Sequence, residues 1–177
     1  IKIIMKLLDN LKQLNVKSLC IAVIENNQLN DYEKALSTVV FFKKVCDYAL
    51  NLNIIITIES DLSVINLKKF IQLVNKKNFK VNLDVGNVVA FGYNLNNYLD
   101  ELYSHIFSIH IKDRNSLFGV NVPLGKGSVN FSQLFKNLYN KKFNGYLIVE
   151  SARKKNLQDG AREYLNFIRK KIKKLND

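Results

Sequence analysis

The sequence predicts an α/β protein in which five short strands form a parallel sheet covered by helices. Short apolar runs alternate along the chain with longer segments whose apolar residues recur at helical spacing. Alternation of this kind is typical of βα units, whose strands lie parallel to one another. Hydrophobic residues make up 47% of the 177 residues, which is enough for a substantial core. We therefore expect a single domain over residues 1–177.

The first half of the chain is expected to contain a helix followed by two strand–helix pairs. One helical stripe predicts the opening helix, and its residues are Ile3, Ile4, Leu7, Leu8, Leu11 and Leu14. The apolar runs after it are rich in isoleucine and valine, which favour strands, and the segments between them have helical periodicity. The expected elements are strand 17–24, helix 31–53, strand 54–60 and helix 64–77.

The second half of the chain repeats this strand–helix pattern three times. The stretch GVNVPLGKGS at 119–128 contains glycines and the single proline of the chain, so it is expected to be a loop. Its GKG segment lacks the spacing of a phosphate-binding P-loop. The expected elements are strand 79–85, helix 95–105, strand 106–112, helix 131–142, strand 145–151 and helix 157–175.

Four successive strands each carry an ionisable residue close to the carboxyl end. Side chains alternate between the two faces of a strand, and one face of each of these strands is apolar, as suits packing against helices. The ionisable residues lie on the other face, and they are Glu59, Asp84, His110 and Glu150. The carboxyl ends of parallel strands lie side by side, and in βα barrels they carry the active site.

Three carboxylates and one imidazole at one place favour a metal site. Like charges this close raise each other's pKa values or destabilise the fold, and a divalent cation would balance them. Oxygen ligands with one imidazole suit Mn²⁺, Mg²⁺ or Co²⁺, with Zn²⁺ as a further candidate. Taken singly, such a carboxylate can cap a helix and such a histidine can be structural. The shared register of all four favours the metal.

The chain resembles the sugar phosphate isomerase/epimerase family in five segments, which are TIES, LDVGNVVAFGYN, HIKDR, VPLGKGSVNF and GYLIVES. This family belongs to the xylose isomerase-like TIM barrel superfamily, which includes D-tagatose 3-epimerase, hexulose-phosphate epimerases and endonuclease IV. The resemblance implies a (β/α)8 TIM barrel, of which this chain would supply the last five strands and their helices. We therefore expect a fragment of a longer natural chain, with association into a homo-oligomer as the alternative that would cover the open sheet edges.

By this resemblance, Glu59, Asp84, His110 and Glu150 match the metal ligands of the family. Glu59 and Glu150 also match the acid and base that act on opposite faces of a sugar or sugar phosphate. The implied reaction is isomerisation or epimerisation by proton transfer next to a carbonyl, through a metal-stabilised enediolate. The expected cofactor is one divalent ion, with Mn²⁺, Mg²⁺ or Co²⁺ preferred to Zn²⁺.

Further residues near these ligands are expected to contact the substrate. The candidates are Asn87, Lys112, Arg114 and Arg153. The three cations suit hydroxyls or a phosphate, although each also fits a solvent-exposed surface charge. Asn87 stands where many family members carry a histidine, and its amide suits a sugar hydroxyl better than a metal. Asp113 fits two roles, either to orient Arg114 or to cap the following loop.

The net charge of +12, from 27 basic and 15 acidic residues, admits nucleic acid or phosphorylated partners. Lysine is spread along the whole chain among many asparagines, which indicates compositional bias rather than a nucleic-acid partner. The partner that the resemblance implies is a small sugar or sugar phosphate. One alternative function is an endonuclease IV-like nuclease, but the sequence offers only His105 and His110 as imidazole ligands. The other alternative is a truncated barrel without catalytic activity.

The sequence also bears on location and on cysteine chemistry. No apolar run approaches the ~18 residues that span a membrane, and the first residues lack the apolar core of a signal peptide. We therefore expect a cytoplasmic protein without membrane contact. Cys20 and Cys46 lack the C-x-x-C spacing of metal or redox sites and are expected to be buried thiols.

Overall fold

The protein is described by a computed structural model that forms two compact units. The described residues are 1–24, 29, 32–116, 119–152 and 155–175. Unit 1 comprises Ile1–Asn82 with Ser104–Phe107, and unit 2 comprises Leu83–Tyr103 with Ser108–Asp177.

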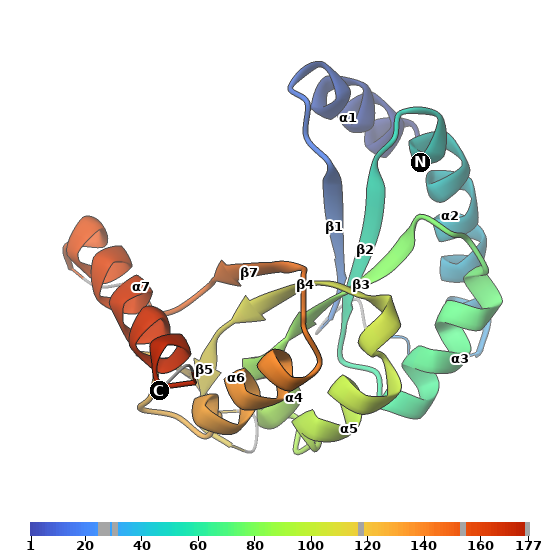
Figure 1. The fold of residues 1–177 in the computed structure, drawn as a ribbon. Helices are drawn as coiled ribbons and strands as arrows, with labels where there is room; N and C mark the ends of the chain where they lie inside the picture. The colour runs from blue at the N-terminus through green and yellow to red at the C-terminus, as the bar shows by residue number, and fades with distance from the viewer. Residues whose placement is uncertain (25–28, 30–31, 117–118, 153–154, 176–177) are drawn as a thin grey trace. The chain divides into compact units, whose positions relative to one another are not determined.

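Five strands form the main sheet, in the order β1-β2-β3-β4-β7 (Figure 1). Their bounds are β1 (Ser18–Val23), β2 (Ile55–Ser60), β3 (Phe79–Asp84), β4 (Ile106–Ile111) and β7 (Tyr146–Val149). The strands β3 and β4 begin in unit 1 and end in unit 2. The pairs β1–β2, β2–β3 and β4–β7 are parallel. The prediction of five parallel strands combined with helices is therefore confirmed.

The described part of unit 1 contains three helices, which are α1 (Lys2–Gln13), α2 (Tyr32–Asn51) and α3 (Val64–Val74). Helix α2 contacts β2 and also contacts both α1 and α3 (Figure 1). Ser63 begins α3, because its hydroxyl accepts a hydrogen bond from the backbone N–H of Asn66. Asn75 ends the same helix in a left-handed conformation, at φ 47°. Local capping residues therefore set the length of α3.

Aromatic side chains form the centre of the core in unit 1. Phe42 of α2 is fully buried, and its ring lies 5.8 Å from that of Phe70 and 4.9 Å from that of Phe79, measured between ring centroids. These contacts join α2, α3 and β3. Burial of large aromatic rings is a major source of stability, so this cluster holds the helices of unit 1 to its strands.

Helix α2 is amphipathic, with Phe42, Val45 and Cys46 buried on one side and Lys43 and Lys44 exposed on the other. It is the longest helix that the structure describes, at 20 residues. Within the described part of the chain, no helix combines the length and the apolar character that crossing a membrane requires.

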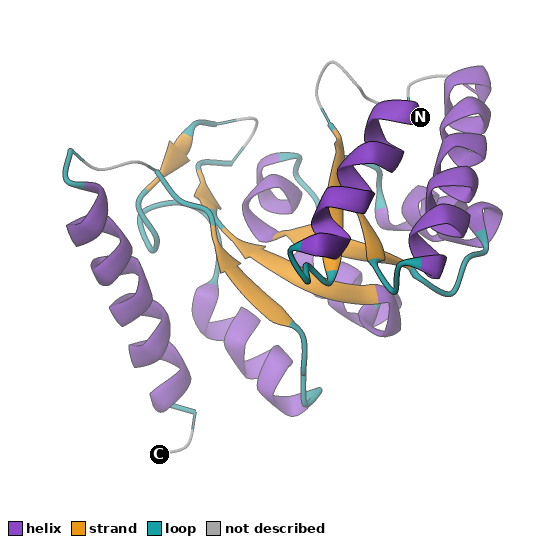
Figure 2. Cartoon of the chain, turned by 90° about the horizontal axis from the view of Figure 1, so that it is seen from above, coloured by secondary structure: helices purple, strands orange, loops and turns teal. Residues whose placement is uncertain are grey.

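Among its described residues, unit 2 contains four α-helices, which are α4 (Val85–Ala90), α5 (Leu95–Glu101), α6 (Phe131–Asn140) and α7 (Leu157–Lys173). Figure 2 shows the helices in purple and the strands in orange. Asn94, Asn130 and Asn156 precede α5, α6 and α7, and their side chains accept backbone N–H groups of the first turn. Part of the asparagine content therefore serves to begin helices.

The expected strand 79–85 and the expected helix 95–105 differ from the observed elements. Asp84 ends β3 and caps α4, so Val85 is helical rather than extended. The helix expected over 95–105 ends as α5 at Glu101, and a 3-10 turn follows at Tyr103–His105. Both additional elements are shorter than two helical turns, which is too short for periodicity to reveal them.

The expected loop at 119–128 contains a short strand. Asn121–Val122 forms β6, which pairs antiparallel with β5 (Asp113–Arg114). The remainder of the segment makes turns, and Gly125 adopts a positive φ of 81°, a conformation that glycine adopts without strain. The segment is therefore anchored along its length to the chain that follows β4.

The prediction that both cysteines are buried is wrong for Cys20. Cys46 on α2 is fully buried, whereas Cys20 on β1 is exposed. Cys20 pairs in register with Thr57 of β2, so it lies on the same sheet face as Thr57 and Glu59, and β1 is the outermost strand on its side of the sheet. Burial is the main cause that raises the pKa of the Cys46 thiol to about 12, with the charge of Asp47 adding to the shift and that of Lys76 opposing it.

The aromatic core predicts a large effect of truncation. Replacing Phe42 by Ala should lower the free energy of unfolding by about 3–5 kcal/mol, because it removes the ring that joins α2, α3 and β3. Urea unfolding followed by circular dichroism would measure the change. The control is Leu73→Ala on α3, where the side chain is 51% exposed, and it should cost about 0.5 kcal/mol or less. Equal losses in the two variants would contradict this assignment of the core.

The cysteine environments predict selective alkylation. In the native protein at roughly pH 8, iodoacetamide should label Cys20 and spare Cys46, since the thiolate is the reacting form and burial suppresses it. Mass spectrometry of digested protein would locate the label. Cys20→Ser should therefore remain unlabelled until denaturant is added, and rapid native labelling of that variant would contradict the burial of Cys46.

Candidate functional site

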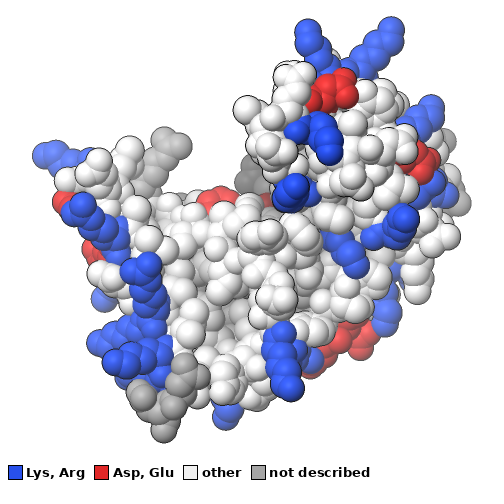
Figure 3. Space-filling view, turned by 45° about the horizontal axis from the view of Figure 1, so that its top comes forward, with Lys and Arg blue, Asp and Glu red and all other residues white. Residues whose placement is uncertain are grey.

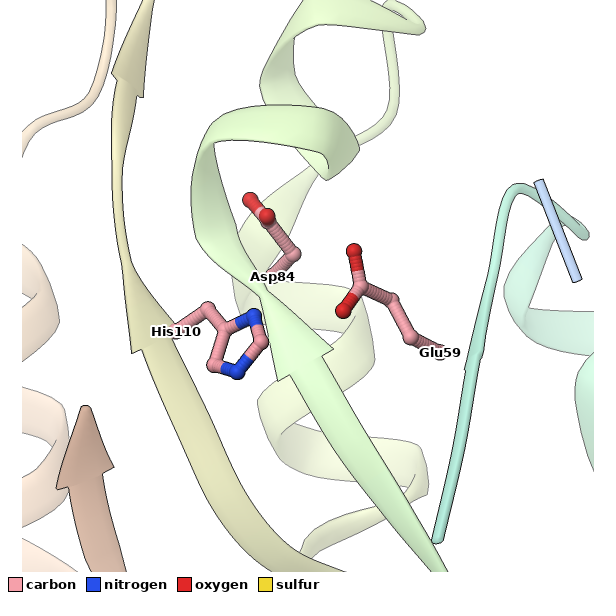
Figure 4. A group of neighbouring side chains, drawn as sticks. All are labelled: Glu59, Asp84 and His110. Atoms are coloured by element: carbon pink, nitrogen blue, oxygen red, sulfur yellow. The ribbon is translucent and has the colours of Figure 1, made fainter. Parts of the chain in front are cut away.

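Glu59 lies near the carboxyl end of β2 in unit 1, where only 6% of the residue is exposed. Its Oε2 accepts a hydrogen bond of 3.0 Å from the side-chain amide of Asn82 on β3. Asn82 and Asp84 lie on the same face of β3, because side chains alternate along a strand. Figure 4 shows Glu59, Asp84 and His110 near the carboxyl ends of β2, β3 and β4. Glu59 is thus a buried carboxylate held by an amide.

Asp84 is the point at which β3 becomes α4, and it is 4% exposed. Its Oδ1 accepts the backbone N–H of Asn87 at 2.8 Å, which is an N-cap interaction. Its Oδ2 lies 3.2 Å from the ammonium nitrogen of Lys112. The two oxygens of this carboxylate therefore face different groups, one the first turn of a helix and the other a buried cation.

His110 and Glu150 are brought together in unit 2 by the parallel pairing of β4 with β7. The backbone N–H of Glu150 continues the ladder by donating to the carbonyl of Ile111, at 3.1 Å. The imidazole Nδ1 of His110 lies 2.9 Å from Oε2 of Glu150. In the same unit, a ring nitrogen of His110 and a carboxylate oxygen of Asp84 lie within 4.8 Å of each other. Donors of this kind at this spacing suit a cation.

Lys112 lies between two of these carboxylates, with 10% of its side chain exposed. Its Nζ is 2.5 Å from Oε1 of Glu150 in addition to its contact with Asp84. Burial alone would lower the pKa of Lys112, but the charge of Asp84 and the hydrogen bond to Glu150 outweigh it and raise the pKa. The hydrogen bond from His110 lowers the pKa of Glu150 to about 2, with burial opposing this shift and Lys112 reinforcing it. Both groups are therefore charged at neutral pH.

Arg114 and Asn87 form a polar pair beside this centre. Arg114 Nη1 donates to the side-chain oxygen of Asn87 at 2.8 Å, and its Nε donates to the carbonyl of Gly119 at 2.9 Å. The guanidinium carbon lies 6.0 Å from the centroid of the Phe91 ring, within the range of a cation–π contact. Arg114 is thus held in one orientation, and the amide that was expected to meet a sugar hydroxyl accepts from it.

Asp113 caps the following loop, which decides between the two roles that the sequence leaves open. Its Oδ2 accepts the backbone N–H groups of Gly125 and Gly127, both at 2.8 Å, and its Oδ1 accepts that of Val129 at 3.1 Å. The residue is fully buried. A Cβ atom at Gly127 would come within 2.3 Å of Asp113 Oδ1, so the loop needs glycine at that position. The backbone of the GKG segment therefore binds the carboxylate of Asp113.

The other basic residues that the structure describes do not indicate a particular binding site. Arg153, one of the predicted substrate contacts, lies outside the described residues. Figure 3 shows Lys and Arg side chains dispersed over the face in view, including a group along α7. Lys170, Lys171 and Lys173 lie in the last turn of α7, where positive charge interacts favourably with the helix dipole. The dispersal agrees with compositional bias as the source of the charge.

Comparisons with known proteins bear on the family and the fold. A family profile described as xylose isomerase-like TIM barrel matches residues 1–171. L-ribulose-5-phosphate 3-epimerase UlaE of Escherichia coli is 32% identical over 72 residues, which are 41% of this chain and 25% of that enzyme.

Two solved structures superpose on nearly the whole chain. The structure of L-ribulose 3-epimerase superposes with a TM-score of 0.82 at 13% sequence identity, and the match covers 98% of this chain and 67% of the epimerase chain. The structure of the IOLI protein, solved with a zinc atom, superposes with a TM-score of 0.76 at 19% sequence identity, and the match covers 96% of this chain and 66% of the IOLI chain. At these identities the two structures establish the fold, and the chain spans only part of each relative.

The wrapping of Asp113 predicts a strong dependence of stability on that carboxylate. Asp113→Ala leaves three backbone N–H groups without their acceptor, and it should lower the free energy of unfolding by at least about 3 kcal/mol. The matched control is Asp100→Ala, which removes an exposed ion pair with Lys141 and should cost about 1 kcal/mol or less. Chemical denaturation of both variants would measure the difference. A loss in Asp113→Ala no larger than that of the control would show that the loop does not depend on this carboxylate.

Proposed function

The chain belongs to the xylose isomerase-like TIM barrel family, and from this premise we propose that it is a divalent-metal-dependent isomerase or epimerase of sugars or sugar phosphates. The observation that carries the proposal is the group of ionisable residues at the ends of parallel strands. In unit 2 this group combines Asp84, His110 and Glu150 with the buried Lys112. The similarity to a curated sugar-phosphate 3-epimerase supports the same reaction class.

We propose Glu59, Asp84, His110 and Glu150 as the metal ligands. The donor set fits a divalent ion, since Asp84 and His110 offer an oxygen and a nitrogen within 4.8 Å of each other, and Asp84 is almost fully buried. Carboxylates with one imidazole suit Mn²⁺, Mg²⁺ or Co²⁺, and the zinc atom of the IOLI structure keeps Zn²⁺ as a further candidate. When bound, the ion would polarise the carbonyl and hydroxyl oxygens of the substrate.

The proposed chemistry is proton transfer by two glutamates. One carboxylate removes the proton from the carbon next to the carbonyl, which leaves an enediolate, and the other returns a proton to the opposite face. Return to the same carbon gives an epimer, and return to the neighbouring carbon gives an isomer. Glu59 and Glu150 are the proposed pair. Glu150 is ionised at neutral pH because of its lowered pKa, so it has the charge state of a base.

The low pKa of Glu150 also sets a requirement on this mechanism. A carboxylate with a pKa of about 2 is a weak base, because the contacts that stabilise its charge oppose protonation. His110 and Lys112 make those contacts. We therefore propose that at least one of the two contacts is exchanged when metal and substrate bind. Exchange of this kind would raise the basicity of Glu150 at the moment of reaction.

A small sugar or sugar phosphate is the proposed partner. The curated relative is named for a sugar phosphate, and a phosphate suits the cations Lys112 and Arg114. Arg114 is already oriented by Asn87 and Gly119, so it would lose little freedom on binding an oxyanion. Asn87, Lys112, Arg114 and Arg153 are the proposed substrate-binding residues.

The proposal predicts metal-dependent exchange of a carbon-bound proton. The purified chain should bind about one Mn²⁺, Mg²⁺ or Co²⁺, and it should then exchange solvent deuterium into a ketose or ketose phosphate. Nuclear magnetic resonance on a panel of such sugars would detect the exchange. Glu59→Gln and Glu150→Gln should each abolish it, whereas Glu101→Gln on the exposed side of α5 should leave it unchanged.

Three results would contradict the proposal in different ways. Exchange retained in either glutamate variant would remove that residue from its assigned role. Two or three zinc ions with cleavage of abasic DNA would favour the nuclease that the family resemblance also admits. Metal binding without exchange into any sugar of the panel would favour a chain that lacks catalytic activity.

A further inference from the structure

The ammonium group of Lys112 lies inside the proposed metal centre rather than at its edge. Its Nζ is 2.5 Å from Oε1 of Glu150 and 3.2 Å from Oδ2 of Asp84. The side chain is 10% exposed and that of Asp84 is 2% exposed. Lysine is rarely buried to this degree unless it is paired, so the two carboxylates account for its position.

The local backbone holds Lys112 in this place. A Cβ atom at Gly86, in the first turn of α4, would come within 3.0 Å of Lys112 Cγ and 3.1 Å of its Cβ and carbonyl carbon. Glycine at position 86 therefore allows α4 to pack directly against Lys112. The next residue, Asp113, is fixed by three backbone hydrogen bonds. The position of Lys112 is thus fixed by the packing of α4 at Gly86 and by the hydrogen bonds of the next residue, Asp113.

The oxygens that Lys112 contacts are the ones that a metal would need. Asp84 uses Oδ1 to cap α4 and directs Oδ2 at Lys112. Glu150 directs Oε2 at His110 and Oε1 at Lys112. In each carboxylate one oxygen is committed to a neighbouring element of the fold. If Asp84 and Glu150 held a divalent ion, the ammonium group of Lys112 would compete with it for these oxygens.

We propose that Lys112 is the resident counter-cation of this centre, which balances Asp84 and Glu150 before the metal arrives and is displaced from their oxygens by the divalent ion. This inference rests on the proposed function, since it takes Asp84 and Glu150 as ligands. The displaced ammonium group remains next to the centre, where it donates to an oxygen of the substrate.

Competition between the two cations sets the direction of the expected effect. Two positive charges within a few ångströms repel each other, and the repulsion is strongest next to the buried carboxylate of Asp84, so displacement of Lys112 would lower the affinity for the metal. Without the lysine, Asp84 and Glu150 repel each other until the metal binds. Replacing Lys112 by a neutral residue should therefore tighten metal binding and destabilise the metal-free protein.

Titration calorimetry with Mn²⁺ on the full chain tests the proposal. Lys112→Met and Lys112→Gln should each bind Mn²⁺ about tenfold more tightly than the unmodified chain, which is the scale on which groups next to a metal alter its affinity. Both variants should also show a larger rise in melting temperature on addition of Mn²⁺. Lys141→Met is the matched control, because Lys141 forms an ion pair of 2.8 Å with Asp100 in the same unit. Its Mn²⁺ affinity should equal that of the unmodified chain.

The outcomes separate this inference from the proposed function. A Lys112 variant that is unfolded alone and folds with Mn²⁺ supports the inference, since the metal then replaces the missing charge. Affinity equal to or weaker than that of the unmodified chain, or a variant that stays unfolded with Mn²⁺, overturns it while the metal centre stands. Asp84→Asn tests the centre itself: if it binds Mn²⁺ as the unmodified chain does, or if no variant binds the ion, the proposed function fails.

Discussion

The alternation of side chains along each parallel strand is the constraint on which the rest of this structure depends. In β2, Ile56 and Ile58 are fully buried, and Glu59 therefore projects from the opposite face. Ile109 and Ile111 of β4 are buried in the same way, with His110 opposite them. A strand can thus supply its full share of the apolar core and still present one ionisable group near its carboxyl end.

The charges of unit 2, which are buried at Asp84, Lys112 and Asp113 and half-exposed at Glu150, are then stabilised by three different kinds of partner. Asp113 is surrounded by backbone N–H groups of a glycine-containing loop. Asp84 meets the first turn of α4 on one side, and Lys112 balances Asp84 and Glu150 on the other. Because a buried charge without a partner is costly, each of these arrangements is a condition for the fold as well as a feature of the site.

Charge balance also links the fold to the proposed chemistry. Membership of the family establishes the architecture, but a shared barrel hosts many reactions, so function has to be argued from the site. Here the same ammonium group that compensates Asp84 also takes part in lowering the pKa of Glu150. A ligand that displaced Lys112 would remove one of the contacts that stabilise the charge of Glu150.

The sequence by itself determined the succession of strands and helices, the apolar face of each strand, and the four ionisable residues near the strand ends. These features follow from repeat distances within a few residues, which the covalent geometry of the chain dictates. Their roles as ligands and catalysts remain predictions. Only the tertiary structure decided that Asp113 caps a loop, that Asn87 accepts from Arg114, that Cys20 is exposed, and that Lys112 bridges two carboxylates. Partners such as Lys112 and Glu150 lie 38 positions apart in the chain. No local pattern specifies such a pairing, because it arises only when packing brings distant segments together.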